Sequence, residues 1–376
     1  MLDLSRLLPG AFCSLVLGEL GADVVKIEDT GGGDYLRLVP PQRDGLGGAF
    51  YALNRGKRSV AIDLKRGAGR ELLLRLLPRF DVLLEGFRPG VLARLGLGWE
   101  ELHAVHPRLI LCSITGYGQT GPHRDRAGHD IDYLALSGAL AAGGEEEGAP
   151  ALPGVQIADL AGGGLWAAVR ILAALREGEG THLDVSMTEG VMSLLLPWLG
   201  DLTFGGQPLR RGARTLNGGY AGYGTYRTGD GKYVAVGALE PKFWGGLCRE
   251  VGISGSAADP IAPAERQREL REQLGRALGV EPRDAWCERL ASADVCVEPV
   301  LEMDELEAHP QHRARGLFYT LHDPQRGPLS LLRLPVDGEP AQRPAPRHGE
   351  HTDEVLAAEG VTAGEIAELR AQGAIK

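Results

Sequence analysis

Short β-rich runs alternate with longer stretches of helical periodicity over residues 1–190 of this chain. Such alternation is typical of βαβ units, in which crossover helices cover the faces of a mainly parallel sheet. The sequence therefore predicts an α/β fold with a doubly wound sheet. Residues 1–5 are typical of the end of a first strand; the other predicted strands are residues 24–28, 59–64, 81–84, 109–114 and 181–187, and the predicted helices are residues 11–20, 70–77, 160–175 and 188–196.

The composition changes between residues 200 and 218, where glycines and arginines cluster and predict a linker or mobile loop. Beyond it, the β-rich runs 226–228 and 232–236 flank a GDG turn, a pattern typical of a β-hairpin. This second region is predicted to form a small α+β domain. The elements expected to follow the hairpin are charged helices at residues 264–278 and 283–291, a short strand at 295–300, a proline-rich extended segment at 328–347 and a final helix at 353–369.

The chain has 376 residues, which is too many for one ordinary hydrophobic core and predicts two domains. Hydrophobic residues make up 43% and charged residues 24% of the sequence, the proportions of a soluble globular protein. The formal net charge of −10 does not indicate a nucleic-acid partner or an anionic membrane surface. Anionic ligands would have to be held by arginines placed locally against that overall charge.

Five cysteines are scattered along the chain without a CxxC pair, a pattern typical of reduced thiols in the cytosol. No apolar run reaches the ~18 residues that a membrane span requires. The N-terminus also lacks the basic region and apolar core of a secretory signal. These features predict a cytoplasmic protein without a membrane partner.

Three residues with acid–base side chains stand in distinctive local strings. His129 is the second residue of GHDIDY, Asp159 the third of IADLAGGG, and Glu240 the fourth of GALEPKFW. Taken singly, each has a structural explanation. His129 could be a surface or core histidine whose ring nitrogens are hydrogen-bonded, Asp159 the N-cap of a helix, and Glu240 a first-turn acid favoured by the helix dipole. The three strings together carry more information than any one of them.

The trio resembles the active site of the α-methylacyl-CoA racemases, a branch of the family III CoA-transferase superfamily, and the resemblance covers almost the whole chain. It implies a Rossmann-like large domain built from N- and C-terminal segments, a smaller α+β domain, and two chains interlocked as a homodimer. The active site would lie between the large domain of one subunit and the small domain of the other. The implied boundaries are 1–195 for the first part of the large domain, 196–219 for the linker, 220–310 for the small domain and 311–376 for the return segment.

The resemblance implies racemisation of (2R)- and (2S)-2-methylacyl-CoA esters by a 1,1-proton transfer through an enolate, without a cofactor or a metal. Two bases on opposite faces of the α-carbon are needed, one protonated and one deprotonated. His129 suits one role because its ordinary pKa is near neutrality, and Asp159 suits the other if burial raises its pKa. Glu240 would orient the imidazole of His129, as the third member of a triad does. The glycines after Asp159 would serve close helix packing, or would let backbone N–H groups reach the enolate oxygen.

Coenzyme A would enter as part of the substrate. The resemblance places it on residues from several loops, with arginines holding phosphates bidentately. Residues 130–133 would line the pantetheine channel just beyond the catalytic histidine. The candidate CoA-binding residues are Arg37, Ile62, Lys65, Gly86, Arg88, Arg94, Gly128, Asp130 and Tyr133. The sequence leaves the acyl chain open among methyl-branched fatty acyl, sterol side-chain and aryl-propionyl groups.

Two other functions remain open. In a family III CoA-transferase the residue that matches Asp159 is a nucleophile that forms a mixed anhydride with the acyl group. Those relatives usually carry an aromatic residue where this chain has His129, and a glycine-rich loop near the position of Glu240, so both features favour proton transfer. A catalytically silent CoA-binding protein would retain the arginines and lose an acid or a base, whereas all three proton-handling residues are present here.

Two further motifs carry little chemistry. The HPQH run at residues 309–312 contains a proline and stands alone, so it does not indicate a metal site. The GAG at residues 67–69 lacks the third glycine and the ribose-binding acid of a dinucleotide fingerprint. A nicotinamide-dependent oxidoreductase is therefore not expected.

Overall fold

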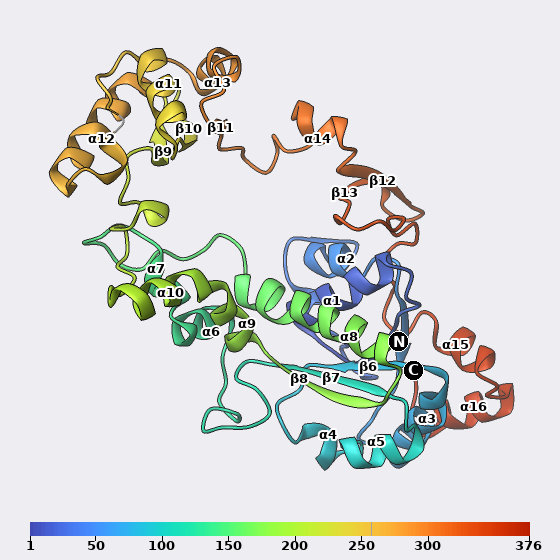
Figure 1. The fold of residues 1–376 in the computed structure, drawn as a ribbon. Helices are drawn as coiled ribbons and strands as arrows, with labels where there is room; N and C mark the ends of the chain where they lie inside the picture. The colour runs from blue at the N-terminus through green and yellow to red at the C-terminus, as the bar shows by residue number, and fades with distance from the viewer. Residues whose placement is uncertain (257) are drawn as a thin grey trace. The chain divides into compact units, whose positions relative to one another are not determined.

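The structure is a computed structural model that describes residues 1–256 and 258–376. Its chain forms two compact units (Figure 1). The large unit comprises Met1–Ser137, Pro153–Leu194 and Gln311–Lys376, and the small unit comprises Gly138–Leu152 and Leu195–Pro310. The large unit is therefore assembled from N- and C-terminal segments, as predicted.

The large unit is built on a six-stranded parallel sheet in the order β5-β2-β1-β6-β7-β8. The chain winds outward from β1 in one direction and then returns to build the other half from β6, which is the doubly wound arrangement. The order reverses between β1 and β6, and ligands of such sheets bind outside the carboxyl ends of the strands at that point. The strands are β1 (Leu2–Asp3), β2 (Val25–Glu28), β5 (Arg58–Ala61), β6 (Val82–Glu85), β7 (Ile110–Thr115) and β8 (Thr181–Ser186).

Helices cover both faces of this sheet, which is why its central strands are buried over their whole length. Figure 1 shows α1 (Leu7–Glu19) and α8 (Trp166–Glu177) on one face, and α4 (Val91–Arg94) and α5 (Trp99–Val105) on the other. The second face packs against leucines of α3 (Gly67–Leu76) and α5 in one continuous core. A strand that is buried on both faces appears in the sequence as an unbroken apolar run, which explains why the positions of these strands were predicted well.

The predicted helix at residues 160–175 begins differently from expectation. Residues Ala158–Leu165 form a π-helix that runs directly into α8. Over Ala158–Glu177 this is a helix long and apolar enough to cross a membrane, by length and composition alone. Its buried side chains Ala167, Ala168, Ile171 and Ala174 belong to the core of the large unit.

The return segment departs from the sequence-based prediction at two places. The final helix predicted at residues 353–369 is wrong: α15 (Thr352–Ala358) and α16 (Ala363–Ala371) are separate. The break follows from Gly360, whose φ is +81°, and from Thr362, which starts α16 with a capping box to Glu365. The hairpin of β12 (Phe318–Asp323) and β13 (Gly327–Leu332) was not predicted as strands.

The small unit contains the predicted hairpin, β9 (Tyr223–Arg227) and β10 (Tyr233–Gly237), with β11 (Val297–Pro299) as the third antiparallel strand. Trp244 and Trp286 are fully buried in its core. The three helices that pack on the sheet are α11 (Pro241–Val251), α12 (Ala264–Leu278) and α13 (Arg283–Ala291). The expected α+β character is confirmed.

Two segments of the small unit differ from the sequence-based prediction. Residues 196–205, inside the predicted linker, form α10 (Leu196–Gly205), which has a proline in its first turn and ends at Gly206 in a left-handed conformation. Residues 138–152 group with this unit because Arg211 donates hydrogen bonds to the carbonyls of Glu145 and Gly148.

The remaining elements are short. They are η1 (Tyr35–Leu38), β3 (Gln42–Arg43), β4 (Leu46–Gly47), α2 (Gly48–Asn54), η2 (Leu77–Arg79), α6 (Asp130–Ser137), α7 (Ala139–Ala142), α9 (Met187–Met192), η4 (Ser193–Leu195), η5 (Thr215–Asn217), η6 (Asp259–Ile261) and α14 (Pro310–Ala314).

Candidate active site

The carboxyl edge of the parallel sheet gathers several of the predicted site residues. Ile62 follows β5, Gly86 and Arg88 follow β6, and His129 ends the long loop after β7. A β-carbon added to Gly86 would lie 3.8 Å from the carbonyl oxygen of Ile114 and 3.9 Å from Cβ of Ser5. The loop after β6 therefore passes close to the ends of β7 and β1, at the point where the strand order reverses.

His129 immediately precedes α6. Its carbonyl oxygen accepts the N–H groups of Asp132 at 2.8 Å and Tyr133 at 3.3 Å. Its own N–H donates to Oδ2 of Asp132 at 2.9 Å, so both backbone groups of the histidine are held by the first turn. The residue itself is exposed, which leaves the imidazole accessible to a ligand.

Asp159 is the second residue of the π-helix and not its N-cap, which is Ile157. The structural explanation of Asp159 as a helix cap therefore fails. π-Helical turns are rare and occur frequently at functional sites. The backbone N–H of Asp159 donates to Oδ1 of Asp130 at 2.9 Å, so the residue next to His129 ties the two segments together.

The Asp159 carboxyl has the electrostatic character that the two-base prediction required. Burial raises the pKa of Asp159 to about 6, and the negative charge of Asp130 acts in the same direction. The positive charge of His129 opposes both effects, because it favours the ionised carboxylate. A carboxyl with a pKa near neutrality can both accept and return a proton.

Tyr133 packs against the residues just before His129. Its hydroxyl donates to the carbonyl oxygen of Gly128 at 2.5 Å, and its ring packs edge-on against Tyr117 at 5.2 Å between centroids. A β-carbon at Gly128 would lie 2.7 Å from this ring, and one at Gly116 only 2.2 Å away. Both glycines are therefore needed for the close approach of the tyrosine.

The three glycines after Asp159 serve helix packing. A β-carbon at Gly162 would lie 2.6 Å from the carbonyl oxygen of Met187, and one at Gly164 would lie 2.9 Å from that of Pro9. A β-carbon at Gly163 would lie 2.8 Å from the side chain of Met187. The π-helix is thus pressed against the start of α9 and against α1, at contacts that no larger residue would permit.

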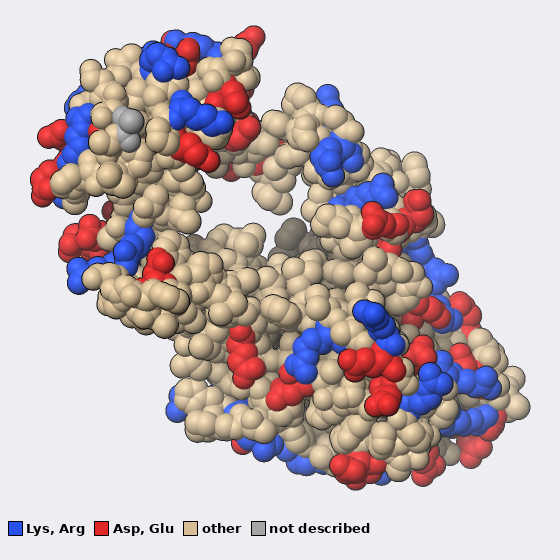
Figure 2. Space-filling model, in the orientation of Figure 1, with Lys and Arg blue, Asp and Glu red and all other residues tan. Residues whose placement is uncertain are grey.

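The cationic candidates for CoA fall into two groups. Arg88, Arg94 and Lys65 are exposed, and within the described residues no acidic side chain forms an ion pair with any of them. Burial and the negative charges of Asp159 and Asp132 raise the pKa of Tyr133, and the positive charge of Arg88 opposes them, so this arginine lies within electrostatic range of the His129 segment. On the face drawn in Figure 2 acidic and basic side chains are interspersed, so an anion there depends on such local arginines.

Arg37 is different, because its guanidinium is already engaged. It is only 5% exposed, its Nη2 lies 2.6 Å from Oε2 of Glu28, and its Nη1 donates to the carbonyl oxygen of Pro346. The same group stacks over the ring of Phe50 at 3.9 Å. These contacts favour a structural role for Arg37 in joining the N-terminal and return segments. Ile62 is likewise buried and bridges Ile375.

The sequence did not single out Arg124. A β-carbon at Gly90, which has a φ of +79°, would lie 3.3 Å from Nη1 of Arg94 and 3.8 Å from Nη2 of Arg124. Two guanidinium groups therefore approach the same turn after β6. The HRDR run just upstream of GHDIDY was the available signal, since basic residues close in sequence to a predicted site are candidates for anion binding.

Glu240 lies in the small unit, as the N-cap residue of α11 ahead of Pro241. Its side chain is exposed and makes no capping hydrogen bond. His129 and Asp159 are thus brought together within the large unit, and Glu240 belongs to the other unit. Over residues 1–256 and 258–376, no group of three or more His, Cys, Asp and Glu side chains could hold a metal ion.

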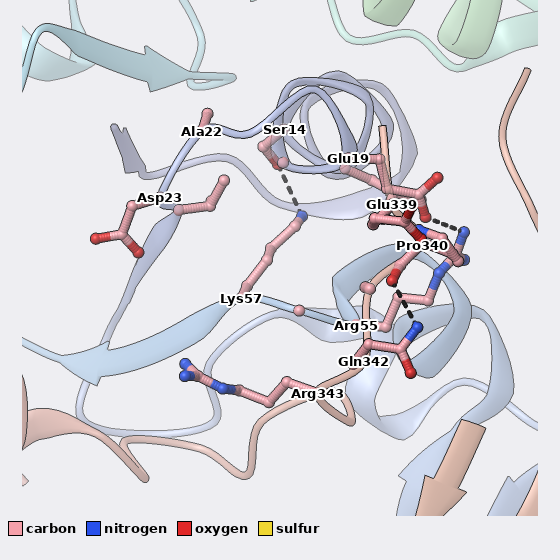
Figure 3. Close-up of a pocket in the computed structure, with 15 residues that line it drawn as sticks. Ser14, Glu19, Ala22, Asp23, Arg55, Lys57, Glu339, Pro340, Gln342 and Arg343 are labelled. Atoms are coloured by element: carbon pink, nitrogen blue, oxygen red, sulfur yellow. Dashed lines mark hydrogen bonds and ion pairs between the residues drawn. The ribbon is translucent and has the colours of Figure 1, made fainter. Parts of the chain in front are cut away.

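A cavity of about 340 Å³ lies at the opposite edge of the sheet, where β2 and β5 begin (Figure 3). Lys57 lines it, but its Nζ donates to Oγ of Ser14 at 2.7 Å and to Oδ1 of Asn54 at 2.8 Å. Arg55 likewise lies 2.7 Å from a carboxylate oxygen of Glu19. Lys57 and Arg55 are therefore already engaged by neighbouring groups, and none of the predicted site residues lines this cavity.

Comparison with known proteins gives a consistent family. The model of CoA-transferase family III matches residues 1–352. The chain is 37% identical to the human alpha-methylacyl-CoA racemase over 100% of its own length and 96% of the relative's. It is 35% identical to the succinate–glutarate CoA-transferase of Agrobacterium fabrum, over 95% of this chain and 94% of that protein.

Solved structures agree with this result. A CAIB/BAIF family protein from Brucella suis superimposes with a TM-score of 0.84 and 31% identity, covering 95% of this chain and 97% of that one. The match includes both the doubly wound sheet and the small α+β unit, because it extends over nearly the whole length of each chain. The chain belongs to the family III CoA-transferases.

Proposed function

We propose that this protein interconverts (2R)- and (2S)-2-methylacyl-CoA thioesters, with His129 and Asp159 as the two bases. The observation that carries the proposal is the hydrogen bond that ties Asp159 to the His129 segment through Asp130, together with the burial of the Asp159 carboxyl, which raises its pKa to about 6. The relative named a racemase, 37% identical over the whole chain, supports the same reaction.

The reaction moves one proton out and one proton in. One base removes the α-proton, and the electron pair of the broken C–H bond moves into the thioester carbonyl to give an enolate. The conjugate acid on the other face then donates its proton to the same carbon, and the carbonyl forms again. The pair ends with its protonation states exchanged, and exchange with solvent restores them. For this cycle the two pKa values must lie close to the working pH.

CoA is held, in this proposal, along the carboxyl edge of the sheet. Arg88 contacts its phosphates from the loop after β6 and Arg94 from α4, with Lys65 from the loop after β5 and Arg124 at the Gly90 turn. Asp130 and Tyr133 border the pantetheine arm beside His129. The support is that Arg88, Arg94 and Lys65 are exposed and have no acidic partner within the described residues, and that Arg88 follows β6, where the strand order reverses.

A cytoplasmic homodimer completes the proposal. The continuous helix Ala158–Glu177 exposes Leu165 at the end of its π-helical part and Trp166, Val169, Leu172 and Leu175 on α8, and an apolar strip of this kind is typical of a subunit interface. Glu240 then serves the histidine of a partner chain, as expected for interlocked subunits. Glu240→Gln should reduce the rate of racemisation less than loss of either base does. A normal rate in this variant would show that Glu240 serves only the end of its helix and takes no part in the reaction.

Deuterium exchange tests the reaction directly. A 2-methylacyl-CoA is incubated in D2O with the protein, and the α-position is followed by NMR. We expect deuterium to enter and the configuration to scramble at related rates. Absence of exchange would overturn the racemase proposal.

The second candidate is CoA transfer, because a 35% identical relative is named a transferase and Asp159 could act as a nucleophile. It predicts that CoA moves onto an added free carboxylic acid and that hydroxylamine traps an acyl group activated on Asp159. Racemisation needs neither the acceptor acid nor a covalent intermediate. The two activities are therefore distinguished in one set of assays with and without the acceptor.

A further inference from the structure

A second buried carboxyl stands at the edge of the sheet that carries the site. Glu85 is the last residue of β6 and is only 4% exposed. Its Oε2 accepts the backbone N–H of Phe87 at 2.6 Å, which fixes the first turn of the loop that carries Arg88. No Lys, Arg or His in the described part of the chain forms an ion pair with it. A carboxyl placed so has a structural or functional reason, since burial without a cation is unfavourable.

A chain of hydrogen bonds from the neighbouring strands holds the Glu85 carboxyl in place. The hydroxyl of Ser113, on the neighbouring strand β7, bonds to Glu85, and its Oγ lies 2.9 Å from Nε2 of His182 on β8. The imidazole of His182 stacks on Trp99 of α5 at 5.9 Å. The polar chain therefore crosses three adjacent strands and ends at the loop after β6.

This arrangement is not a nucleophilic triad. In a triad the histidine stands between the acid and the serine, so that it can take the hydroxyl proton. Here Ser113 stands between the acid and the histidine, and its side chain is buried. The hydroxyl can donate to one neighbour and accept from the other, which suits an anchoring role.

The loop after β6 requires an anchor. Gly86 begins it and Gly90 ends it, the latter with a φ of +79°, so its backbone is permissive at both ends. Burial raises the pKa of Glu85 to about 7, although its bonds to Ser113 and to the Phe87 N–H act in the opposite direction. Either protonation state retains an oxygen that accepts the Phe87 N–H, so the anchor does not depend on the charge.

We propose that Glu85 is a positioning residue: it orders the 86–90 loop through the Phe87 N–H, so that Arg88 meets the CoA portion of the substrate in a fixed direction. Ser113 and His182 hold the Glu85 side chain for this task. The inference rests on the proposed binding of CoA by Arg88, and it adds that Glu85 sets the direction from which Arg88 reaches CoA. It predicts an effect on binding of CoA and not on the proton transfers at His129 and Asp159.

The variants Glu85→Ala and Glu85→Gln separate the anchor from the charge. Alanine removes the acceptor of the Phe87 N–H, and we expect the KM for 2-methylacyl-CoA to rise by about tenfold with kcat nearly unchanged, the pattern of a lost binding interaction. Glutamine retains a carbonyl oxygen at the same reach and should restore the KM to within about twofold. An unchanged KM in Glu85→Ala, or a glutamine variant as impaired as the alanine one, would overturn the proposal.

Two additions keep the test decisive. Glu100→Ala removes an exposed glutamate of α5 and should leave KM and kcat unaltered. Calorimetric titration with CoA itself measures binding without catalysis, so weakened CoA binding in Glu85→Ala supports the positioning role even if the wild-type protein shows no exchange in D2O. If Glu85→Ala does not fold, Ser113→Ala replaces it, with an expected loss of CoA affinity of about threefold; unchanged affinity there would contradict the proposal.

Discussion

Buried carboxyls in two regions of the large unit differ in what faces them. Burial raises the pKa of Asp3, but Lys26 and Lys57 outweigh it and hold the pKa below its usual value. Glu28 likewise faces Arg37 and Lys26, which lower its pKa to about 2 against the effect of burial. No ion pair within the described residues offsets burial at Asp159 or Glu85, and their pKa values rise to about 6 and about 7. The comparison teaches that cation pairing, more than depth, separates stabilising acids from acids that can exchange protons.

Loss of either proposed base should produce the largest effect. His129→Ala and Asp159→Ala each remove one of the two proton carriers, and we expect racemisation to fall by about a thousandfold or more. CoA binding should persist, because the cationic residues around the 86–90 loop are unchanged. Deuterium exchange followed by NMR and calorimetric titration with CoA measure the two properties. Full activity in either variant would rule out the two-base scheme.

The paired region should respond through stability. Nζ of Lys26 lies 3.0 Å from Oδ2 of Asp34 and donates to the carbonyl oxygen of Ser5 at 2.8 Å, all in the buried core. Lys26→Met leaves Asp34 without its cation, so we expect the free energy of unfolding to fall by about 3–5 kcal/mol. Chemical denaturation measures it.

The exposed pair of Arg66 and Asp63, 3.2 Å apart, gives the matched control for the buried lysine. Arg66→Met should change stability by less than about 1 kcal/mol, because solvent screens an exposed ion pair. Equal effects of the two substitutions would show that burial does not set the strength of pairing in this unit.

Sequence patterns predicted the two regions to different degrees. The strands were predictable because residues such as Val25 and Leu83 lie in apolar runs buried on both faces of the sheet. The π-helical start at Asp159 was not, since the added residue in its turn leaves no mark in the apolar period. The hydrogen bond from Asp159 to Asp130 joins residues that are 29 positions apart, and only the packing of the π-helix against the start of α6 defines it.

Other differences had a readable cause. The break between α15 and α16 is present in the sequence as Gly360 followed by the capping-box pattern of Thr362 and Glu365, but the apolar period continues across it and predicts a single helix. Glu85 could not have been singled out, because an acid at the end of an apolar run does not reveal whether a cation faces it. The site residues as a set therefore came from the family resemblance, whereas their electrostatics came from packing.

The raised pKa of Asp159 also predicts a stability that depends on pH. The unfolded chain has the ordinary value of 3.8, so below that pH both states bind the proton and the folded protein is not weakened. As the pH rises through about 6 the buried carboxyl must ionise, and stability is lost. Asp159→Asn removes this penalty, and we expect it to stabilise the protein by about 1–3 kcal/mol at pH 8.

At pH 4 the same asparagine substitution should have little effect, because the carboxyl is then largely protonated in the folded protein. Thermal unfolding at the two pH values measures the difference. A larger gain at pH 4 than at pH 8 would contradict the assignment of a raised pKa.

Asp130→Asn should give the smallest change in activity of these variants. It tests whether a neighbouring charge, as well as burial, sets the pKa of Asp159. Its side-chain oxygen can still accept the Asp159 N–H, so the loop contact remains, but the negative charge that helps to raise the pKa of Asp159 is removed. The acid limb of the pH–rate profile for deuterium exchange should therefore move to lower pH, with the maximal rate reduced only modestly. Asp125, which is exposed in the same loop, provides the control, since Asp125→Asn should leave the profile in place. If Asp130→Asn leaves the acid limb unmoved, burial alone governs Asp159; a movement to higher pH would mean that this limb reports a group other than Asp159.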